Sequence, residues 1–517
     1  MTQRVRHIVV VGGGTAGWLT AGTLAAVSRS QRAEPIAITL VESPNIPIIG
    51  VGEGTWPTMR RTLRRMGVRE TDFIRSCNAT FKQGAKFARW VTGDEQDYYY
   101  HPLVLPQGYF ETNLGLHWLE GEKQQSFSRS TCPQEEICEA GLAPKLITTA
   151  EYDGVANYAY HLDAGAFAEF LKAHCTEKLG VRHVLADMTG VRAAENGDIA
   201  AIETAQAGPI TGDLFVDCTG FRSLLLGGHF NVPFRSCKHI LFIDRALAVQ
   251  VPYPDPDTPL ASHTISTAQG AGWIWDIGLQ SRRGTGHVFS SAHTDEGEAE
   301  ADLRRYIRAT GGDDTHLSVR RIDIEPGHRE RFWAGNCVAI GLSAGFLEPL
   351  EASAILLVEI SAQFLAEQMP ATREAMEIVA DRFNRTFAYR WDRIIDFLKL
   401  HYLLSQRTDN DFWIDNRAQA SIPDSLKELM QLWQYHPPSD ADFDRAVEVF
   451  PGASYQYILY GMGFRPECGY DAPSRAAARE ADRYFERNRQ ETRSMVGSLP
   501  PNRDLLDKIA RHGLQPI

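Results

Sequence analysis

Three glycines near the amino terminus have the spacing of a site that binds a dinucleotide. Gly12, Gly14 and Gly17 satisfy Gly-x-Gly-x-x-Gly, and Glu42 follows at about the expected distance. Glycine permits a tight turn and lets the backbone approach a pyrophosphate, while an acid after the second strand can hold a ribose hydroxyl. The residue types therefore predict a dinucleotide site.

The elements around this turn are those that such a site requires. The run 6–11 is continuous and β-branched, which predicts a buried parallel strand, and 36–41 predicts a second strand that ends at Glu42. A helical stretch between them begins at the turn, where Thr15 and Ala16 are also assigned to the cofactor and the helix dipole favours an anion. This context favours a dinucleotide site over a structural glycine-rich turn.

The middle of the chain adds further strands with turn residues at their ends. Residues 181–191 and 199–205 flank Glu-Asn-Gly-Asp, a hairpin signal. Residues 213–220 and 336–341 are apolar runs that end in glycine. Strands of this kind that return to a dinucleotide favour a flavin-type α/β fold with an inserted sheet over a simple nicotinamide domain.

The last third of the chain predicts helices. Residues 374–404 are amphipathic, and 421–517 predict shorter helices broken by proline. Aromatic residues in this part could line a substrate site, although each alone is better explained as core: Phe412, Trp413, Trp433, Tyr455, Tyr457 and Tyr460.

Composition excludes several classes of protein. The net charge of -12, with no run of Lys and Arg, gives no electrostatic reason to expect nucleic acid or an anionic membrane as a partner. The eight cysteines are scattered without a Cys-x-x-Cys pair, so we expect free thiols, a cytoplasmic location and no metal site. No apolar run approaches the roughly 18 residues of a membrane span.

One motif suggests a different enzyme. Residues 341–345 fit Gly-x-Ser-x-Gly after a strand, the nucleophile elbow of hydrolases. Pro349 soon interrupts the helix that the elbow requires, and a hydrolase would leave the dinucleotide unit unexplained. We interpret this turn as packing against the flavin.

Two further segments identify a family. Residues 42–58, ESPNIPIIGVGEGTWPT, look like a segment that contacts flavin, and 272–278, GWIWDIG, is similar to a Trp-x-Trp-x-Ile-Pro signature with Gly278 in place of proline. With these motifs the chain resembles the flavin-dependent tryptophan halogenase family over essentially its whole length. In that family the tryptophan pair, here Trp273 and Trp275, is understood to block ordinary monooxygenation. Without the other matches, two aromatics on one strand face would be the simpler interpretation.

The resemblance implies roles for specific residues. Lys82, after Phe81, matches the catalytic lysine, and Glu351, at the end of Phe-Leu-Glu-Pro-Leu-Glu, matches the catalytic acid. The amides of Ser353 and Ala354 fall where the family binds halide. Further flavin contacts are assigned to Ile49, Gly50, Val51, Gly52, Leu342 and Ile355, and the substrate pocket to His101 and Leu103.

Neighbouring residues could be confused with the catalytic pair. Lys86 lies four residues after Lys82 and could share a helix face with it, but we treat it as structural. Pro349 should break any helix between Glu348 and Glu351, which leaves Glu348 near the turn and Glu351 directed to the substrate.

The sequence departs from the family at two places near the reaction. Ala352 stands where tryptophan-acting members have serine, and Leu103 stands where they often have a stacking phenylalanine. We therefore expect an electron-rich aromatic, an indole or a tryptophan-like compound, without committing to free tryptophan.

The resemblance implies that reduced FAD, oxygen and chloride or bromide yield hypohalous acid. Lys82 would hold this acid by a hydrogen bond or form a haloamine. Residues 1–370 would form the FAD-binding module, with about 91–160 contributing to the substrate pocket, and 371–517 a helical module covering the substrate.

No second dinucleotide fingerprint exists, so a separate NAD(P)H-dependent flavin reductase is the expected partner. The oligomeric state stays open, with a homodimer as one option. The alternatives are a flavin-dependent hydroxylase and a flavin-binding protein without turnover.

Overall fold

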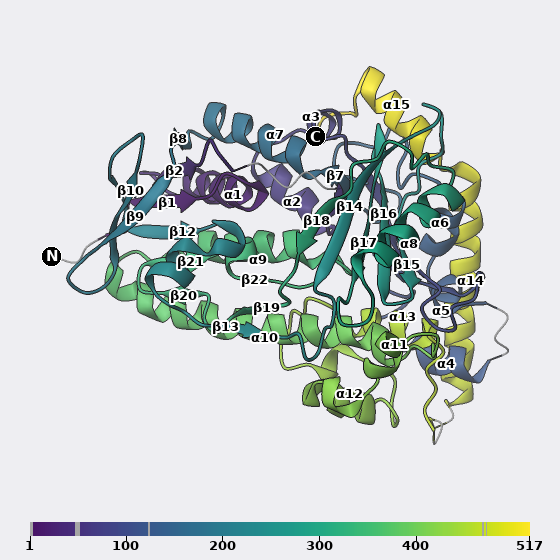
Figure 1. Cartoon of the computed structure of the whole chain (residues 1–517). Coiled ribbons are helices and arrows are strands. Elements are labelled where there is room, and N and C mark those ends of the chain that lie inside the picture. The colour runs from purple at the N-terminus through teal and green to yellow at the C-terminus, as the bar shows by residue number, and fades with distance from the viewer. Residues whose placement is uncertain (1–3, 47–51, 122–124, 468–469, 472) are drawn as a thin grey trace. The chain divides into compact units, whose positions relative to one another are not determined.

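The chain forms two compact units, each assembled from three separate stretches (Figure 1). The computed structural model describes residues 4–46, 52–121, 125–467, 470–471 and 473–517. Unit 1 comprises Met1–Ala79, Leu162–Cys237 and Glu325–Trp391, and unit 2 comprises Thr80–His161, Lys238–Ile324 and Asp392–Ile517. These two units are defined by which parts of the chain pack together. The predicted division at residue 370 separates the parts by function, and it stays a prediction.

Unit 1 is a mixed α/β unit. Its elements are β1 (His7–Val11), α1 (Thr15–Gln31), β2 (Ala37–Glu42), β3 (Gly52–Gly54), α2 (Thr58–Arg65), α3 (Glu70–Ser76), α7 (Ala164–Glu177), β8 (Arg182–Leu185), β9 (Met188–Ala193), β10 (Ile199–Thr204), β11 (Ile210–Thr211), β12 (Leu214–Asp217), η1 (Gly220–Arg222), η2 (Leu224–His229), β13 (Phe234–Ser236), β19 (Gly327–Arg329), β20 (Trp333–Ala334), β21 (Cys337–Ala339), η3 (Gly341–Ser343), β22 (Gly345–Phe346) and α9 (Ser353–Glu367).

The central sheet of unit 1 has six strands in the order β20-β21-β12-β1-β2-β8. All of its pairs are parallel except β20 with β21. β1 is buried at four of its five positions, as expected for an apolar strand covered on both faces. α1 is buried along most of its length and packs against both α7 and α9. The carboxyl ends of β1 and β2 thus point to the glycine-rich turn.

Unit 2 is built on a larger antiparallel sheet. Its elements are β4 (Thr80–Lys82), β5 (Gly84–Ala88), β6 (Tyr98–Pro102), α4 (Leu114–Glu120), α5 (Phe127–Thr131), α6 (Gln134–Glu139), β14 (Arg245–Pro252), β15 (Thr264–Gln269), β16 (Gly272–Gly278), β17 (Arg282–Phe289), α8 (Glu296–Ala309), β18 (Arg320–Asp323), α11 (Asp411–Asp415), η4 (Gln419–Ser421), α12 (Asp424–Leu432), η5 (Asp440–Asp442), α13 (Gly452–Gly461), α14 (Arg475–Ser498) and α15 (Asn502–His512). Two elements, β7 (Ala159–Asp163) and α10 (Arg373–Leu403), continue from one unit into the other.

The sheet of unit 2 has seven strands in the order β18-β14-β17-β16-β15-β5-β6. Only β15 and β5 pair in parallel. One face of it packs on α8, where Leu303 and Ile307 join Leu247, Ile274 and Phe289 in a buried cluster. β16, which carries the tryptophan pair, is an interior strand and is buried at every position.

Several sequence predictions about these elements need correction. The predicted strand 181–191 is two strands: β8 joins the parallel sheet, and only β9 forms the hairpin with β10. The predicted short helices after residue 421 include α14, which has 24 residues. The amphipathic helix predicted at 374–404 is confirmed as α10.

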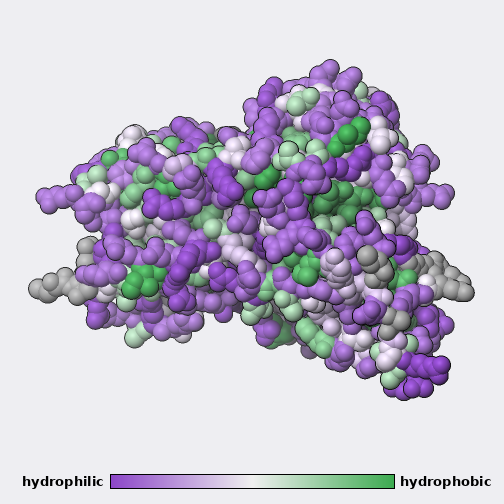
Figure 2. Space-filling model, turned by 90° about the horizontal axis from the view of Figure 1, so that it is seen from below, coloured by the Kyte–Doolittle hydropathy of each residue, from purple (hydrophilic) through white to green (hydrophobic). Residues whose placement is uncertain are grey.

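No helix among the described residues combines the length and apolar character needed to cross a bilayer. The face shown in Figure 2 is mostly hydrophilic, with hydrophobic residues in groups between hydrophilic ones.

Candidate functional site

The glycines of the amino-terminal turn have different physical reasons to be glycine. Gly12 has φ +120°, and a Cβ there would lie 2.1 Å from the carbonyl oxygen of Cys218. A Cβ on Gly17 would lie 1.8 Å from the carbonyl oxygen of Gly12. Gly14 has an ordinary extended backbone, and a Cβ there would meet nothing within 4 Å. Neither conformation nor packing requires glycine at position 14, so its open side is where a ligand can approach the backbone.

The first turn of α1 can hold an anion. Gly14 is the N-cap and supplies no side-chain hydrogen bond to the free amides of the helix. Thr15 donates a hydrogen bond of 3.4 Å to the carbonyl oxygen of Ala164, so its hydroxyl also ties the turn to the start of α7. The free backbone amides of this turn and the open space beside Gly14 fit a pyrophosphate.

The turn that contains Leu342 lies against the same loop. Leu342 is in η3, and a Cβ on Gly341 would lie 2.8 Å from Cβ of Ala16. The structure therefore brings the predicted flavin-packing turn next to the predicted phosphate loop. Gly52 is buried in β3, whereas Ile49, Gly50 and Val51 lie outside the described residues.

Ser343 in this turn is not a nucleophile. It is 1% exposed, and its hydroxyl donates to the carbonyl oxygens of Asp217 and Ile340. No α-helix starts at the serine, since α9 begins only at Ser353. The rejection of a hydrolase thus has a structural basis.

Glu351 lies just before α9. The prediction that Pro349 keeps Glu348 and Glu351 out of a helix is confirmed, since both precede Ser353. Both glutamates are buried, at 1% and 5% exposure. The carbonyl of Glu351 accepts a 3.0 Å hydrogen bond from Nε1 of Trp56, which lies in the predicted flavin segment. The direction predicted for the Glu351 carboxylate stays a prediction.

The residue after Glu351 has a strained backbone. Ala352 is left-handed, with φ 54° and ψ 38°, and is the N-cap of α9 without a side-chain hydrogen bond. The amides of Ser353 and Ala354 belong to the uncapped first turn that this residue opens, and Ile355 is buried one position further on. Free amides at a helix amino terminus suit a halide ion.

Lys82 is a buried cation on a short strand of unit 2. Its side chain is 4% exposed, and β4 pairs with β7 so that Lys82 faces Ala159 and Thr80 faces His161. Burial of an ammonium is costly, so a buried lysine usually has polar partners or a chemical role. Glu351 belongs to unit 1.

His161, which no sequence motif singles out, is near Lys82. Burial first, and then the charge of Lys82, hold the pKa of His161 well below its ordinary range. Its Nε2 lies 2.8 Å from the hydroxyl of Thr264 on β15. The lysine therefore has a neutral imidazole in its surroundings at neutral pH.

The expectation that Lys82 and Lys86 share a helix face is wrong. Lys86 lies on β5, a different strand, and pairs at 2.6 Å with Glu139. It also lies 4.2 Å from the ring centre of Tyr98. These contacts support a structural role for Lys86.

The tryptophan pair fills the interior of unit 2. Trp273 and Trp275 are two residues apart on β16, so both side chains point to the same face of the sheet. The ring centres of Trp90 and Trp273 are 6.3 Å apart. Trp275 has Gly286 as its cross-strand partner, and a Cβ on Gly286 would lie 2.1 Å from the indole ring. Gly286 makes room for the ring, a relation that no sequence motif revealed.

The predicted substrate residues His101 and Leu103 lie at the end of β6. His101 is 4% exposed, hydrogen-bonds through Nε2 to the hydroxyl of Ser454 at 2.9 Å, and faces Phe397 and Phe450. The backbone of Leu103 is held by Gln134 and Asn157. The aromatic candidates are all buried, as core residues would be: Phe412, Trp413, Trp433, Tyr455, Tyr457 and Tyr460.

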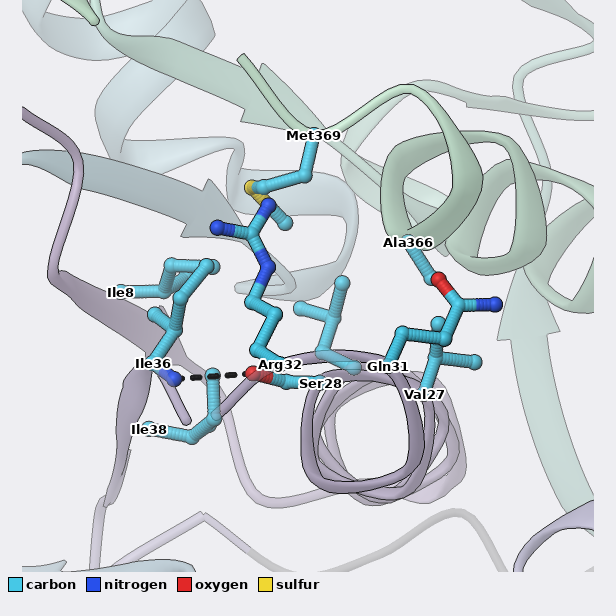
Figure 3. Close-up of a pocket in the computed structure, with 10 residues that line it drawn as sticks. Ile8, Val27, Ser28, Gln31, Arg32, Ile36, Ile38, Ala366 and Met369 are labelled. Carbon is cyan, nitrogen blue, oxygen red and sulfur yellow. Dashed lines mark hydrogen bonds between the residues drawn. The ribbon is translucent and has the colours of Figure 1, made fainter. Parts of the chain in front are cut away.

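A small pocket in unit 1 is unrelated to these residues (Figure 3). Ile8, Ile36 and Ile38 line it together with Ser28, which accepts a 2.8 Å hydrogen bond from the amide of Ile36. It has room for about one water molecule. It lies where β1 and β2 begin, whereas α/β sheets bind ligands at the carboxyl ends of their strands.

Comparisons with known proteins bear on this geometry. A family model described as tryptophan halogenase matches residues 7–478. The tryptophan 6-halogenase SttH of Streptomyces toxytricini is 34% identical and covers 96% of this chain and 97% of its own. A solved tryptophan halogenase from Shewanella frigidimarina has a TM-score of 0.96, 46% identity and 99% coverage of both chains. The flavin-dependent halogenase BrvH from Brevundimonas has a TM-score of 0.85, 35% identity and coverage of 98% and 99%.

Proposed function

Because the chain belongs to the tryptophan halogenase family, we propose that it uses reduced FAD, oxygen and chloride or bromide to halogenate an electron-rich aromatic compound. Family membership confirms the predicted α/β flavoprotein fold and the halogenase class of enzyme. The substrate, the cofactor and the residue roles below are the content of the proposal.

The observation that carries the proposal is the burial of Lys82. A 4% exposed lysine directly after Phe81, in a chain that matches halogenases from end to end, is positioned to act on a small reagent away from bulk water. A surface lysine would have no such position. Thr80 and His161, on the same face of the β4–β7 pair, flank it.

The residues of unit 1 fit FAD. Gly12, Gly14 and Gly17 would hold the pyrophosphate, and Glu42 the ribose. When bound in its reduced form, FAD supplies, with oxygen and halide, the hypohalous acid that the other residues use. The amides of Ser353 and Ala354 would hold the halide ion.

The chain's own residues then direct the halogen to the ring. The ammonium of Lys82 donates a hydrogen bond to the oxygen of hypohalous acid. As the halogen passes to a ring carbon, the O–X bond breaks, and the oxygen takes a proton from the ammonium and leaves as water. Alternatively, Lys82 first forms a haloamine, and the halogen passes from its nitrogen to the ring. Glu351 stabilises the cationic ring and takes its proton. Holding the reagents in place is worth several kcal/mol of barrier, roughly, by analogy with intramolecular reactions.

An indole or a tryptophan-like compound is the proposed substrate. SttH is named for tryptophan, and BrvH is named only as a flavin-dependent halogenase. Leu103 offers no ring for stacking at a position where tryptophan halogenases often have phenylalanine, so the proposal does not commit to free tryptophan. A separate NAD(P)H-dependent flavin reductase would supply the reduced FAD. The cytoplasmic location remains a prediction.

Product analysis tests the proposal. The protein is supplied with FAD, a flavin reductase, NADH, oxygen and a panel of indoles that includes tryptophan, first with chloride and then with bromide. We expect products heavier by one halogen, with the matching isotope pattern, only when halide is present. Hydroxylated products that form regardless of halide would contradict the proposal and indicate a monooxygenase.

A further inference from the structure

His183 lies beside the acid that is expected to hold the cofactor's ribose. β8 pairs in parallel with β2, with His183 opposite Leu40, two residues before Glu42. Nε2 of His183 is 2.8 Å from Oε2 of Glu42. Both atoms are buried, and neither forms a hydrogen bond of good geometry in the described part of the chain, so this contact is a close polar pairing and not an aligned hydrogen bond. The two side chains are therefore each other's polar partner.

This distance determines where His183 carries a proton. A carboxylate oxygen has only lone pairs, so an unprotonated Nε2 at 2.8 Å would place lone pairs against each other. The proton must lie on Nε2, in either the neutral ring or the imidazolium. The contact with the carboxylate is then attractive, and it occupies Oε2 and not Oε1.

Other contacts fix both side chains. The indole ring of Trp18, directly after Gly17, meets the His183 ring edge to face, with ring centres 5.2 Å apart. A Cβ on Gly13 would lie 2.3 Å from Cγ of Glu42, so the glutamate side chain lies directly on the glycine-rich turn. The carboxylate group thus has little freedom except the choice of hydrogen-bond partner.

We propose that His183 is a positioning residue for the adenosine half of the cofactor, because it holds one oxygen of Glu42 and turns the other toward a ribose hydroxyl. The inference rests on the proposed use of FAD. It concerns a residue outside the glycine motif, on a strand that enters the sheet well over a hundred residues later in the chain. The Glu42 side chain retains 15% exposure, which leaves its second oxygen accessible to a ligand.

A double-mutant cycle on FAD affinity tests the proposal. The Kd of oxidised FAD is measured by flavin fluorescence for wild type, His183→Phe, Glu42→Ala and the double variant. Phenylalanine keeps an aromatic ring against Trp18 and removes the polar nitrogens. We expect His183→Phe to raise Kd about tenfold, because it removes the polar contact of Nε2 with the charged carboxylate. In the Glu42→Ala background the same change should alter Kd less than about twofold.

Three controls separate positioning from general damage. His183→Gln restores a donor and should recover much of the affinity. FMN has no adenosine, so its weaker binding should not respond to either substitution. His7→Gln removes a histidine from the same sheet, where Nε2 of His7 lies 2.8 Å from the hydroxyl of Thr39, and should leave the Kd of FAD unchanged.

The outcomes distinguish this inference from the function on which it rests. If wild type binds FAD but His183→Phe has no effect, or weakens binding equally with and without Glu42, the positioning role is overturned and the proposed function stands. If Glu42→Ala leaves FAD binding intact, the positioning role is likewise overturned. If wild type binds no FAD, both proposals are wrong.

Discussion

The hydroxyl of Thr80 donates a 2.6 Å hydrogen bond to the carbonyl oxygen of Gly278. Thr80 is two residues before Lys82 on β4, and Gly278 ends the strand that carries Trp273 and Trp275. This buried hydrogen bond joins the strand of the candidate catalytic lysine to the strand of the tryptophan pair. It also gives Gly278 a structural role at the position where the family usually has proline.

Thr80→Val should therefore impair the reaction without removing any reacting group. Valine has the shape of threonine but leaves the Gly278 carbonyl without its donor, which costs about 1–3 kcal/mol of stability. A small shift of Lys82 should lower the rate of halogenation by about ten- to a hundredfold. The rate is measured by product formation at saturating FAD. Thr80→Ser keeps the donor, and failure of serine to restore the rate would contradict the explanation.

Gly14→Ala should weaken cofactor binding without harming the fold. Gly14 has an ordinary backbone and open space at its Cβ position, so the apo protein should keep its stability within about 0.5 kcal/mol. A methyl group where the pyrophosphate approaches should weaken FAD binding by about ten- to a hundredfold.

Gly17→Ala is the matched control for this prediction. A Cβ there meets the Gly12 carbonyl oxygen at 1.8 Å, so this variant should destabilise the apo protein itself. Thermal melting and FAD titration separate the two effects. Normal FAD affinity in Gly14→Ala would place the pyrophosphate elsewhere.

Glu351→Gln should remove most of the activity, whereas Glu348→Gln should not. Both glutamates are buried, so each variant places a glutamine amide in a buried position. Glu348→Gln therefore shows how much of the effect comes from the buried amide itself. Loss of the group that takes the ring proton should lower the rate by about a hundredfold or more. The rate is followed by product formation, with FAD affinity measured in parallel. Equal losses in the two variants would mean that Glu351 has no special role.

Glu359 should make the protein less stable as pH rises. This residue lies on α9 beside Thr58 and Thr62 of α2, and burial raises its pKa to about 7 from an ordinary value of 4.5. The folded protein keeps a proton that the unfolded chain releases, so stability is lost between about pH 4.5 and 7. The total loss is up to about 3 kcal/mol.

Glu359→Gln cannot ionise and should remove this dependence. The variant should melt at a higher temperature than wild type at pH 8 and at nearly the same temperature at pH 5. The comparison uses thermal melting at both values. A constant difference between variant and wild type across this range would show that Glu359 is not protonated in the fold.

The sequence predicted those features that depend on local pattern. The glycine spacing and the apolar runs were enough for β1, α1 and β2, and Pro349 was enough to keep Glu351 out of α9. Spacing alone gave a wrong prediction for Lys82 and Lys86, which are four positions apart. That interval fits one helix face, but it also fits two consecutive strands, and the chain forms β4 and β5 there.

Relations between distant residues could not be read from one sequence. His161 faces Thr80 through a strand pair, His183 meets Glu42 through neighbouring parallel strands, and Gly286 accommodates Trp275 across the sheet. His161, His183 and Gly286 belong to no local motif. Strand register decides such contacts, and one chain without its fold does not reveal the register.

The central claim is that Lys82 delivers the halogen, and one comparison tests it most directly. Halogenated product from an indole panel is measured by mass spectrometry for wild type, Lys82→Ala and Lys86→Ala, with FAD binding and melting temperature checked for each. Lys86 is the control because it pairs with Glu139 on a different strand. We expect Lys82→Ala to bind FAD and lose the product, while Lys86→Ala retains it. Product formation by folded, FAD-bound Lys82→Ala at the wild-type rate would contradict the account.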